Sequence, residues 1–147
     1  MDILKSKVLG VDLGDKNIGL AVSTSNLKMA LPYKIIRFRS DKLLVDDLQK
    51  IITEENIAKV VVGIPYNSDG SDSAQTIKRK RQLEYLKKHL NIPVLGFDER
   101  YTTDIAHSYG MQLNLNNKKR KKKIDKIAAS IMLQDYLNSI EKNRKIT

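Results

Sequence analysis

Four acidic residues stand in or beside apolar stretches of the sequence. Asp12 interrupts VLGVDLG, Asp98 and Glu99 follow VLGF, and Asp125 is the second residue of IDKIAASIMLQDYL. Carboxylates that gather at one point repel each other and are tolerated where a divalent cation compensates them; Mg²⁺ and Mn²⁺ prefer such oxygen ligands. We therefore expect a site for Mg²⁺ or Mn²⁺. Two ions held there would activate a water and stabilise the leaving oxygen in phosphodiester hydrolysis.

Hydrophobic periodicity predicts the elements that must position these acids. Strands are expected at residues 8–13, 18–23, 33–38, 59–64 and 94–97, and helices at 41–55, 74–90 and 124–140. Ser40 is the expected N-cap of the first helix, and Thr102 or Thr103 is expected to cap a further short helix. Residues 114–123 are expected to form a mobile loop, because no apolar residue follows Leu115 in that stretch.

The order of the elements predicts one α/β domain over residues 1–147. The first three strands would form an antiparallel meander, and the later strand–helix–strand units would make right-handed parallel crossovers, which gives the strand order 3-2-1-4-5. Open α/β sheets bind ligands at the carboxyl ends of their strands, near the reversal of strand order. Asp12, Asp98, Glu99 and the loop at 65–73 all lie at that edge, so we expect them to converge.

Asp125 lies, by helical spacing, one turn before Ala128 and Ala129, whose small side chains let the helix approach the sheet closely. From there Asp125 would reach the strand ends. The alternative is an aspartate in the first turn that interacts with the helix dipole.

Charge and composition limit the class of protein. The 147 residues carry a net charge of +10 and contain no cysteine. The positive excess lies in residues 78–88 (KRKRQLEYLKK) and 116–147, and clusters of this kind attract polyanions through counterion release. A solvated face chosen for solubility is the alternative. No apolar run is long enough to span a membrane and the first residues do not look like a signal peptide, so a cytoplasmic protein is expected.

Four segments, in order, resemble motifs of the YqgF family, also called RuvX, a group of small RuvC-like proteins with the ribonuclease H fold. They are VLGVDLGDKNIGLAVS (8–23), VVVGIPYNSDGS (60–71), GFDERYTT (96–103) and IDKIAASIMLQDYL (124–137). The resemblance implies a five-stranded mixed sheet flanked by helices and a metal-dependent nuclease that matures pre-16S ribosomal RNA. Resolution of Holliday junctions in branched DNA is the alternative. Ribosomal precursor particles would be partners, and the oligomeric state is left open.

Carried over by position, the resemblance makes Asp12, Glu99 and Asp125 the catalytic and metal-binding set. Asp98 and Arg100 would support it, with Arg100 on the scissile phosphate or in an ion pair that fixes the acidic loop. Because neighbours on a strand point to opposite sides, only one of Asp98 and Glu99 should face the site squarely, and the longer Glu99 is favoured.

The residues expected to bind substrate come from three regions, namely the loop after the fourth strand, the second helix and the basic run before residue 124: Tyr66, Asn67, Lys78, Arg79, Arg81, Lys119, Arg120 and Lys122. For Asn67 a tight turn is an equal alternative, and for Tyr66 packing at the edge of the site. His89 and His107 lack a ligand pattern and are interpreted as surface residues.

Two other classes of protein remain open at this stage. DLGDKNIG also resembles the phosphate-binding hairpin of actin-like ATPases and sugar kinases, which normally pair two such domains around the nucleotide. The second rival is a non-catalytic RNA- or ribosome-binding module on a nuclease scaffold.

Overall fold

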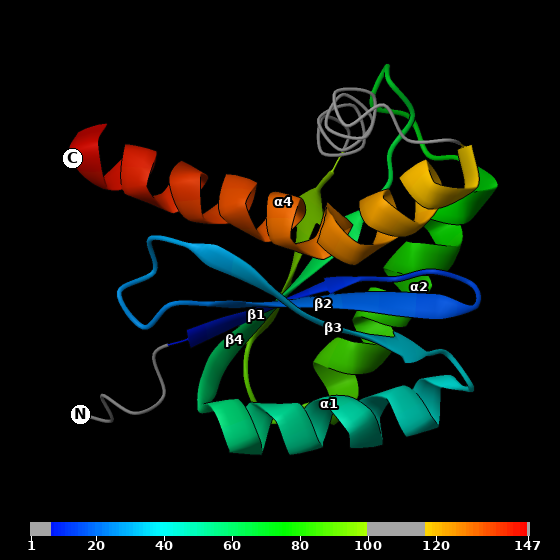
Figure 1. The fold of residues 1–147 in the computed structure, drawn as a ribbon, viewed down its shortest axis with the longest axis horizontal. Coiled ribbons are helices and arrows are strands. Elements are labelled where there is room, and N and C mark those ends of the chain that lie inside the picture. Colours follow the sequence, from blue (N-terminus) through cyan, green and yellow to red (C-terminus); the bar gives the residue numbers. More distant parts are fainter. Residues whose placement is uncertain (1–6, 100–116, 147) are drawn as a thin grey trace.

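A computed structural model describes residues 7–99 and 117–146 and contains one five-stranded sheet (Figure 1). The strands are β1 (Lys7–Asp12), β2 (Asn17–Ser23), β3 (Ala30–Arg37), β4 (Ile57–Ile64) and β5 (Val94–Asp98). Their order is β3-β2-β1-β4-β5; β1, β2 and β3 pair antiparallel, while β4 runs parallel to both β1 and β5. The predicted strand order and the central position of β1 are confirmed.

Helices cover both faces of the sheet. Figure 1 shows α1 (Asp41–Glu55) and α2 (Ala74–His89) on one side and α4 (Asn117–Ile146) across the other. The N-cap of α1 is Ser40, as predicted, and its side chain accepts a hydrogen bond from the Leu43 amide at 3.2 Å. Within the described ranges no helix is both long and apolar enough to cross a membrane.

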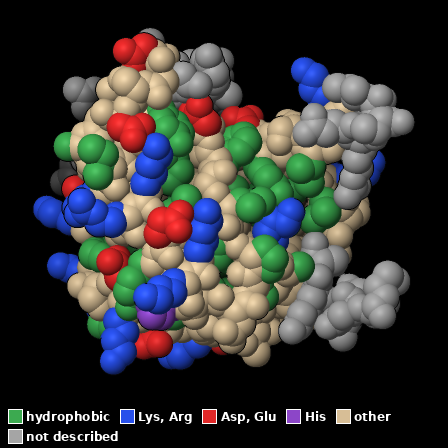
Figure 2. All heavy atoms as spheres, turned by 180° about the vertical axis from the view of Figure 1, so that it is seen from behind, with side chains coloured by type: hydrophobic (Ala, Val, Ile, Leu, Met, Phe, Trp, Pro, Cys, Tyr) green, Lys and Arg blue, Asp and Glu red, His purple; other side chains and the backbone are tan. Residues whose placement is uncertain are grey.

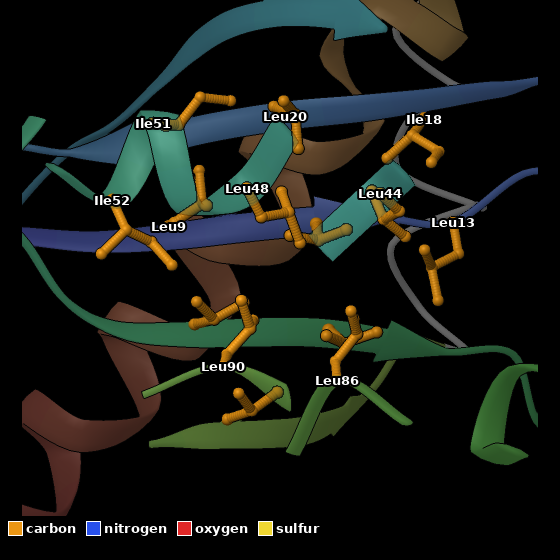
Figure 3. Close-up of a cluster of buried hydrophobic side chains, with 14 of the residues drawn as sticks. Leu9, Leu13, Ile18, Leu20, Leu44, Leu48, Ile51, Ile52, Leu86 and Leu90 are labelled. Atoms are coloured by element: carbon orange, nitrogen blue, oxygen red, sulfur yellow. The ribbon is translucent and has the colours of Figure 1, made fainter. Parts of the chain in front are cut away.

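The core has two parts because each strand points alternate side chains to opposite faces. On the α1 and α2 side, Leu9, Ile18 and Leu20 of the sheet pack against Leu48 of α1 and Leu86 of α2 (Figure 3). On the α4 side, Val8, Ala21 and Val61 meet Ala129, Met132 and Leu133. The sheet is therefore fixed on both faces, and its strand ends are held in a defined place.

Two expectations differ from the structure. Residues 117–123 do not form a loop, because the backbone of α4 is already helical from Asn117. Lysine and arginine are good helix formers, so the lack of apolar residues removes packing but not helix propensity. In addition, β3 begins at Ala30 and contains Pro32, which an edge strand tolerates. The short helix expected near Thr102 or Thr103 lies outside the described residues.

Candidate active site

Asp12 ends β1 on the face that α4 covers. Two residues earlier, Gly10 faces the same helix, since a Cβ there would lie 2.9 Å from Leu133 Cβ. Gly19 of β2 pairs with Asp12, and the parallel register places Gly63 of β4 on its other side. The carboxyl group of Asp12 thus emerges between two residues that have no side chain.

Glu99 occupies the space above Gly63. Its backbone amide donates to the Ile64 carbonyl at 3.2 Å, which extends the β4–β5 ladder just beyond β5. A Cβ at residue 63 would overlap the Glu99 carboxylate, so the side chain reaches from β5 over β4 toward Asp12 on β1. Burial, followed by the charge and hydrogen bonding of Asp12, raises the pKa of Glu99 to about 8. The two carboxyl groups therefore meet, although their residues are 87 positions apart in sequence.

Asp98 points to the other face of the sheet. It lines a hollow on the α2 side together with Tyr66 and Lys80. Of the two acidic neighbours, Glu99 is the one that the fold brings to Asp12.

Several residues that the sequence singled out lie beyond the described parts. Arg100 is outside the described residues. Asp125, Lys119, Arg120 and Lys122 lie on the helical backbone of α4, but their side chains are not described. Residue 125 comes two turns before Met132, which lies against the position of Gly63. The roles assigned to these residues stay predictions.

The donor set at Asp12 and Glu99 suits a hard cation. Among the side chains that the structure describes, no group of three or more His, Cys, Asp or Glu residues is placed to hold a metal ion. The two carboxyl groups nevertheless meet, and the charge of Asp12 disfavours the ionised form of Glu99. A divalent cation would relieve that repulsion, and carboxylate oxygens are the ligands Mg²⁺ and Mn²⁺ prefer, so these residues fit such an ion.

Arg79 requires a correction. The sequence placed it in the basic cluster of the second helix as a substrate-binding residue, but it is 1% exposed and is among the largest fully buried side chains. Its guanidinium donates to Asp15 at 2.9 Å and to Gln82 at 2.7 Å, and Gln82 donates to Asp41 at 3.1 Å. The reason is that α2 packs on the sheet through this side of the helix, and the carboxylate of Asp15 compensates the buried charge.

This cluster of Asp15, Arg79, Gln82 and Asp41 joins three parts of the fold: the turn after β1, α2 and the first turn of α1. The positive charge of Arg79 also lowers the pKa of Glu99 against the effect of burial. Sequence analysis missed the cluster. Only the helical spacing of residue 79 with buried Leu83 and Leu86 hinted at an inward direction.

The remaining predicted contacts lie near the surface. Asn67 donates from its side chain to Ser71 at 3.0 Å, and Gly70 has φ 87°, so this loop contains a tight turn. Lys78 and Arg81 are exposed, with Lys78 donating to Asp15 at 2.8 Å. His89 is also exposed, as expected, while His107 lies outside the described residues.

Comparison with known proteins places this arrangement in a family. The model of the family RuvX, described as Holliday junction resolvase, matches residues 6–139. The chain belongs to the RuvX family. A relative from Clostridium novyi, provisionally named pre-16S rRNA nuclease, is 40% identical over 134 residues, which cover 91% of this chain and 99% of that protein. A relative of the same name from Clostridium acetobutylicum is 35% identical over 134 residues, with the same coverage.

Solved structures show the same fold as this RuvX member. The Thermus thermophilus RuvC protein in complex with a Holliday junction aligns with a TM-score of 0.57 and 13% identity, over 92% of this chain and 96% of that one. The fowlpox virus resolvase with Holliday junction DNA aligns with a TM-score of 0.52 and 16% identity, over 91% and 98%. At these identities the likeness establishes the ribonuclease H-like fold.

Proposed function

We propose that this RuvX protein is a divalent-metal-dependent nuclease that hydrolyses phosphodiester bonds in structured RNA, with the precursor of 16S ribosomal RNA as its substrate. The observation that carries the proposal is the meeting of Asp12 and Glu99 between Gly19 and Gly63, at the edge where α/β sheets bind ligands. The names of its relatives direct the proposal to ribosomal RNA.

Asp12 and Glu99, with Asp125 from α4, would hold Mg²⁺ or Mn²⁺. When bound, the metal supplies charge for the phosphate oxygens and for a water that attacks phosphorus. Among the chain's own residues, Gly63 leaves room for the Glu99 carboxylate, and Gly19 places no side chain beside Asp12 on β2, so that a bulky sugar–phosphate backbone can come close there. Arg79 fixes the adjacent turn through Asp15 and favours the ionised form of Glu99.

The basic surface would bring the polyanion to this point. Figure 2 shows lysine and arginine side chains crowded over the half of the rear face where α2 lies, with acidic side chains among them. Lys78, Arg81, Lys87 and Lys88 are exposed residues of α2. Counterion release from such a cluster favours binding without sequence preference. The proposal treats residues 1–147 as one nuclease domain, and a cytoplasmic location remains a prediction.

The test incubates the purified protein with labelled pre-16S RNA, branched DNA and ATP in Mg²⁺ or Mn²⁺. The wild type is expected to cleave the RNA, and Asp12→Asn and Glu99→Gln are expected to lose cleavage about 10³-fold with binding retained. Asp46→Asn, an exposed carboxylate on α1, is the matched control and is expected to cleave normally.

Each rival function has its own signature in that test. Cleavage of branched DNA alone would favour the Holliday-junction alternative. ATP hydrolysis without cleavage of nucleic acid would favour the kinase-like reading of the β1–β2 hairpin, and binding of RNA without cleavage by the wild type would favour a non-catalytic module. Cleavage that survives both site variants would refute the assignment of Asp12 and Glu99.

A further inference from the structure

A cavity of about 670 Å³ lies on the α2 side of the sheet, beside β5. Its apolar lining comes from Ile64, Leu83 and Tyr66, and its polar lining from Lys80, Glu84 and Asp98. This volume is in the range of sites that take small organic molecules. The fold therefore has a cavity at the same edge of the sheet as Asp12 and Glu99, the edge formed by the carboxyl ends of the strands.

The aromatic wall of the cavity is held in place before any ligand arrives. Tyr66 is half-buried, and the Lys80 ammonium lies 4.9 Å from the centre of its ring. Lys80 in turn donates to Asp72 at 2.9 Å. The Tyr66 ring is thus fixed in the wall of the cavity with a positive charge over it, a pairing that suits a base together with its phosphate.

The cavity and the carboxyl pair lie on opposite faces of the sheet at the end of β5. Asp98 and Glu99 are consecutive, and the pleat sends Asp98 into the cavity and Glu99 over Gly63. A nucleic acid strand whose phosphate lies at Asp12 and Glu99 would consequently have a neighbouring nucleotide next to the cavity.

We propose that this cavity binds one unpaired nucleobase of the substrate strand, adjacent to the phosphate that is cleaved. The inference rests on the proposed nuclease function and adds a rule for where cleavage occurs. Tyr66 provides the stacking surface, and the Asp98 carboxylate accepts a hydrogen bond from an N–H group of the base. A base that is paired in a duplex must leave its stack at a cost of a few kcal/mol, so cleavage next to unpaired bases is favoured.

The binding test uses the Asp12→Asn protein, so that the RNA stays intact. Single-stranded RNA oligonucleotides carry the fluorescent base 2-aminopurine at one position each. Stacking on Tyr66 is expected to quench the fluorescence at one position only. Tyr66→Phe should keep the quenching, while Tyr66→Ala should abolish it. Tyr33→Ala is the matched control, because Tyr33 is also half-buried and also has a lysine over its ring, Lys34 at 5.4 Å.

The cleavage test uses the otherwise wild-type protein and an RNA that is abasic at the position found by quenching. The wild type is expected to lose about tenfold in kcat/KM on this RNA, and Tyr66→Ala is expected to cleave both RNAs equally. If Tyr66→Ala fails to fold, Asp98→Asn, which keeps the side-chain volume, is expected to reduce the quenching several-fold.

The outcomes separate this inference from the proposed function. Equal quenching at every position, or quenching unchanged in Tyr66→Ala, overturns the base-binding cavity. If the wild type cleaves the abasic RNA with the same kcat/KM as the unmodified RNA, the base-binding cavity is also overturned, but the nuclease function stands. Quenching at one position that depends on Tyr66, in a protein that cleaves no nucleic acid, would support the cavity and refute the nuclease function.

Discussion

At the scale of single residues, the candidate site depends on two glycines as much as on two carboxylates. Gly19 and Gly63 flank Asp12, and Glu99 uses the room above Gly63. Burial and the nearby charge of Asp12 oppose the ionisation of Glu99 in the absence of a cation. The pair is thus preorganised for a positive charge, and its geometry and its titration can be tested separately.

Gly63→Ala tests the geometry. The new Cβ would overlap the Glu99 carboxylate, while its distance to Met132 Cγ, 3.4 Å, is an ordinary contact. The displaced carboxylate is expected to reduce kcat about 100-fold, since misplacements near 1 Å have effects of that size. Single-turnover cleavage of labelled RNA measures it. Gly10→Ala is the control: its Cβ meets Leu133 on the same face, so it should lower stability but not kcat, and equal kcat losses in both variants would contradict the prediction.

Glu99→Gln tests the titration in metal-free protein. The folded protein holds the Glu99 proton up to a pKa of about 8, whereas the unfolded chain releases it near the ordinary value of 4.5. The folded state binds more protons between these values, so the free energy of unfolding should fall as pH rises from 4.5 to about 8, by on the order of a few kcal/mol. Urea unfolding in EDTA at pH 5, 6.5 and 8 measures this. Glu99→Gln should flatten the profile, and parallel profiles would show that Glu99 titrates normally.

At the scale of elements, α2 is the part that joins the strand ends. The Thr76 hydroxyl donates to the Pro65 carbonyl after β4, and Arg79 binds Asp15 after β1. Both attachments lie in the first two turns of the helix, which begins at Ala74 with Ser73 as its cap. A shift of α2 would therefore move the turn next to Asp12 and the loop next to the cavity together.

Arg79→Ala is expected to destabilise the fold by about 2 kcal/mol, because it removes a buried hydrogen-bonded side chain and leaves Gln82 without its donor. Lys78 shares the acceptor Asp15 but its side chain is 56% exposed, so Lys78→Ala should leave stability unchanged within error. Urea unfolding of both variants at pH 7 decides the matter. Equal effects would mean that the buried arginine contributes no more than an exposed ion pair.

At the scale of the whole molecule, the net charge of +10 favours binding of a polyanion, and Lys78 is an exposed basic residue that donates to Asp15, just after the carboxyl end of β1. Binding should accordingly weaken with salt.

Replacement of both Lys78 and Arg81 by glutamine should reduce the slope of log K against log salt by about 1 to 2, since each cation neutralises roughly one phosphate. The matched control replaces Lys42 and Lys50, two exposed lysines of α1. Fluorescence anisotropy with labelled RNA in roughly 50 to 300 mM KCl measures the slope. If the α1 variant changed the slope as much as the α2 variant, binding would be spread over the whole surface rather than centred on α2.

The sequence by itself determined the elements and their order. Alternation in VLGVDLG, the cap at Ser40 and the helical spacing of Leu44 and Leu48 are local signals, and they predicted β1 and α1 within a residue or two. The secondary structure of the charged segment was less well predicted. The basic run before residue 124 was mistaken for a loop, because polarity alone does not distinguish a solvated helix from a loop.

Only the tertiary structure decided which side chains meet. Glu99 rather than Asp98 faces Asp12 because the register of β5 on β4 sets the phase of the pleat, and register depends on contacts between strands distant in sequence. Arg79 is buried and its neighbours Lys78 and Arg81 are exposed because α2 rests on the sheet at one particular rotation. Local sequence specifies what each element is, while the packing of elements specifies which residues become a site.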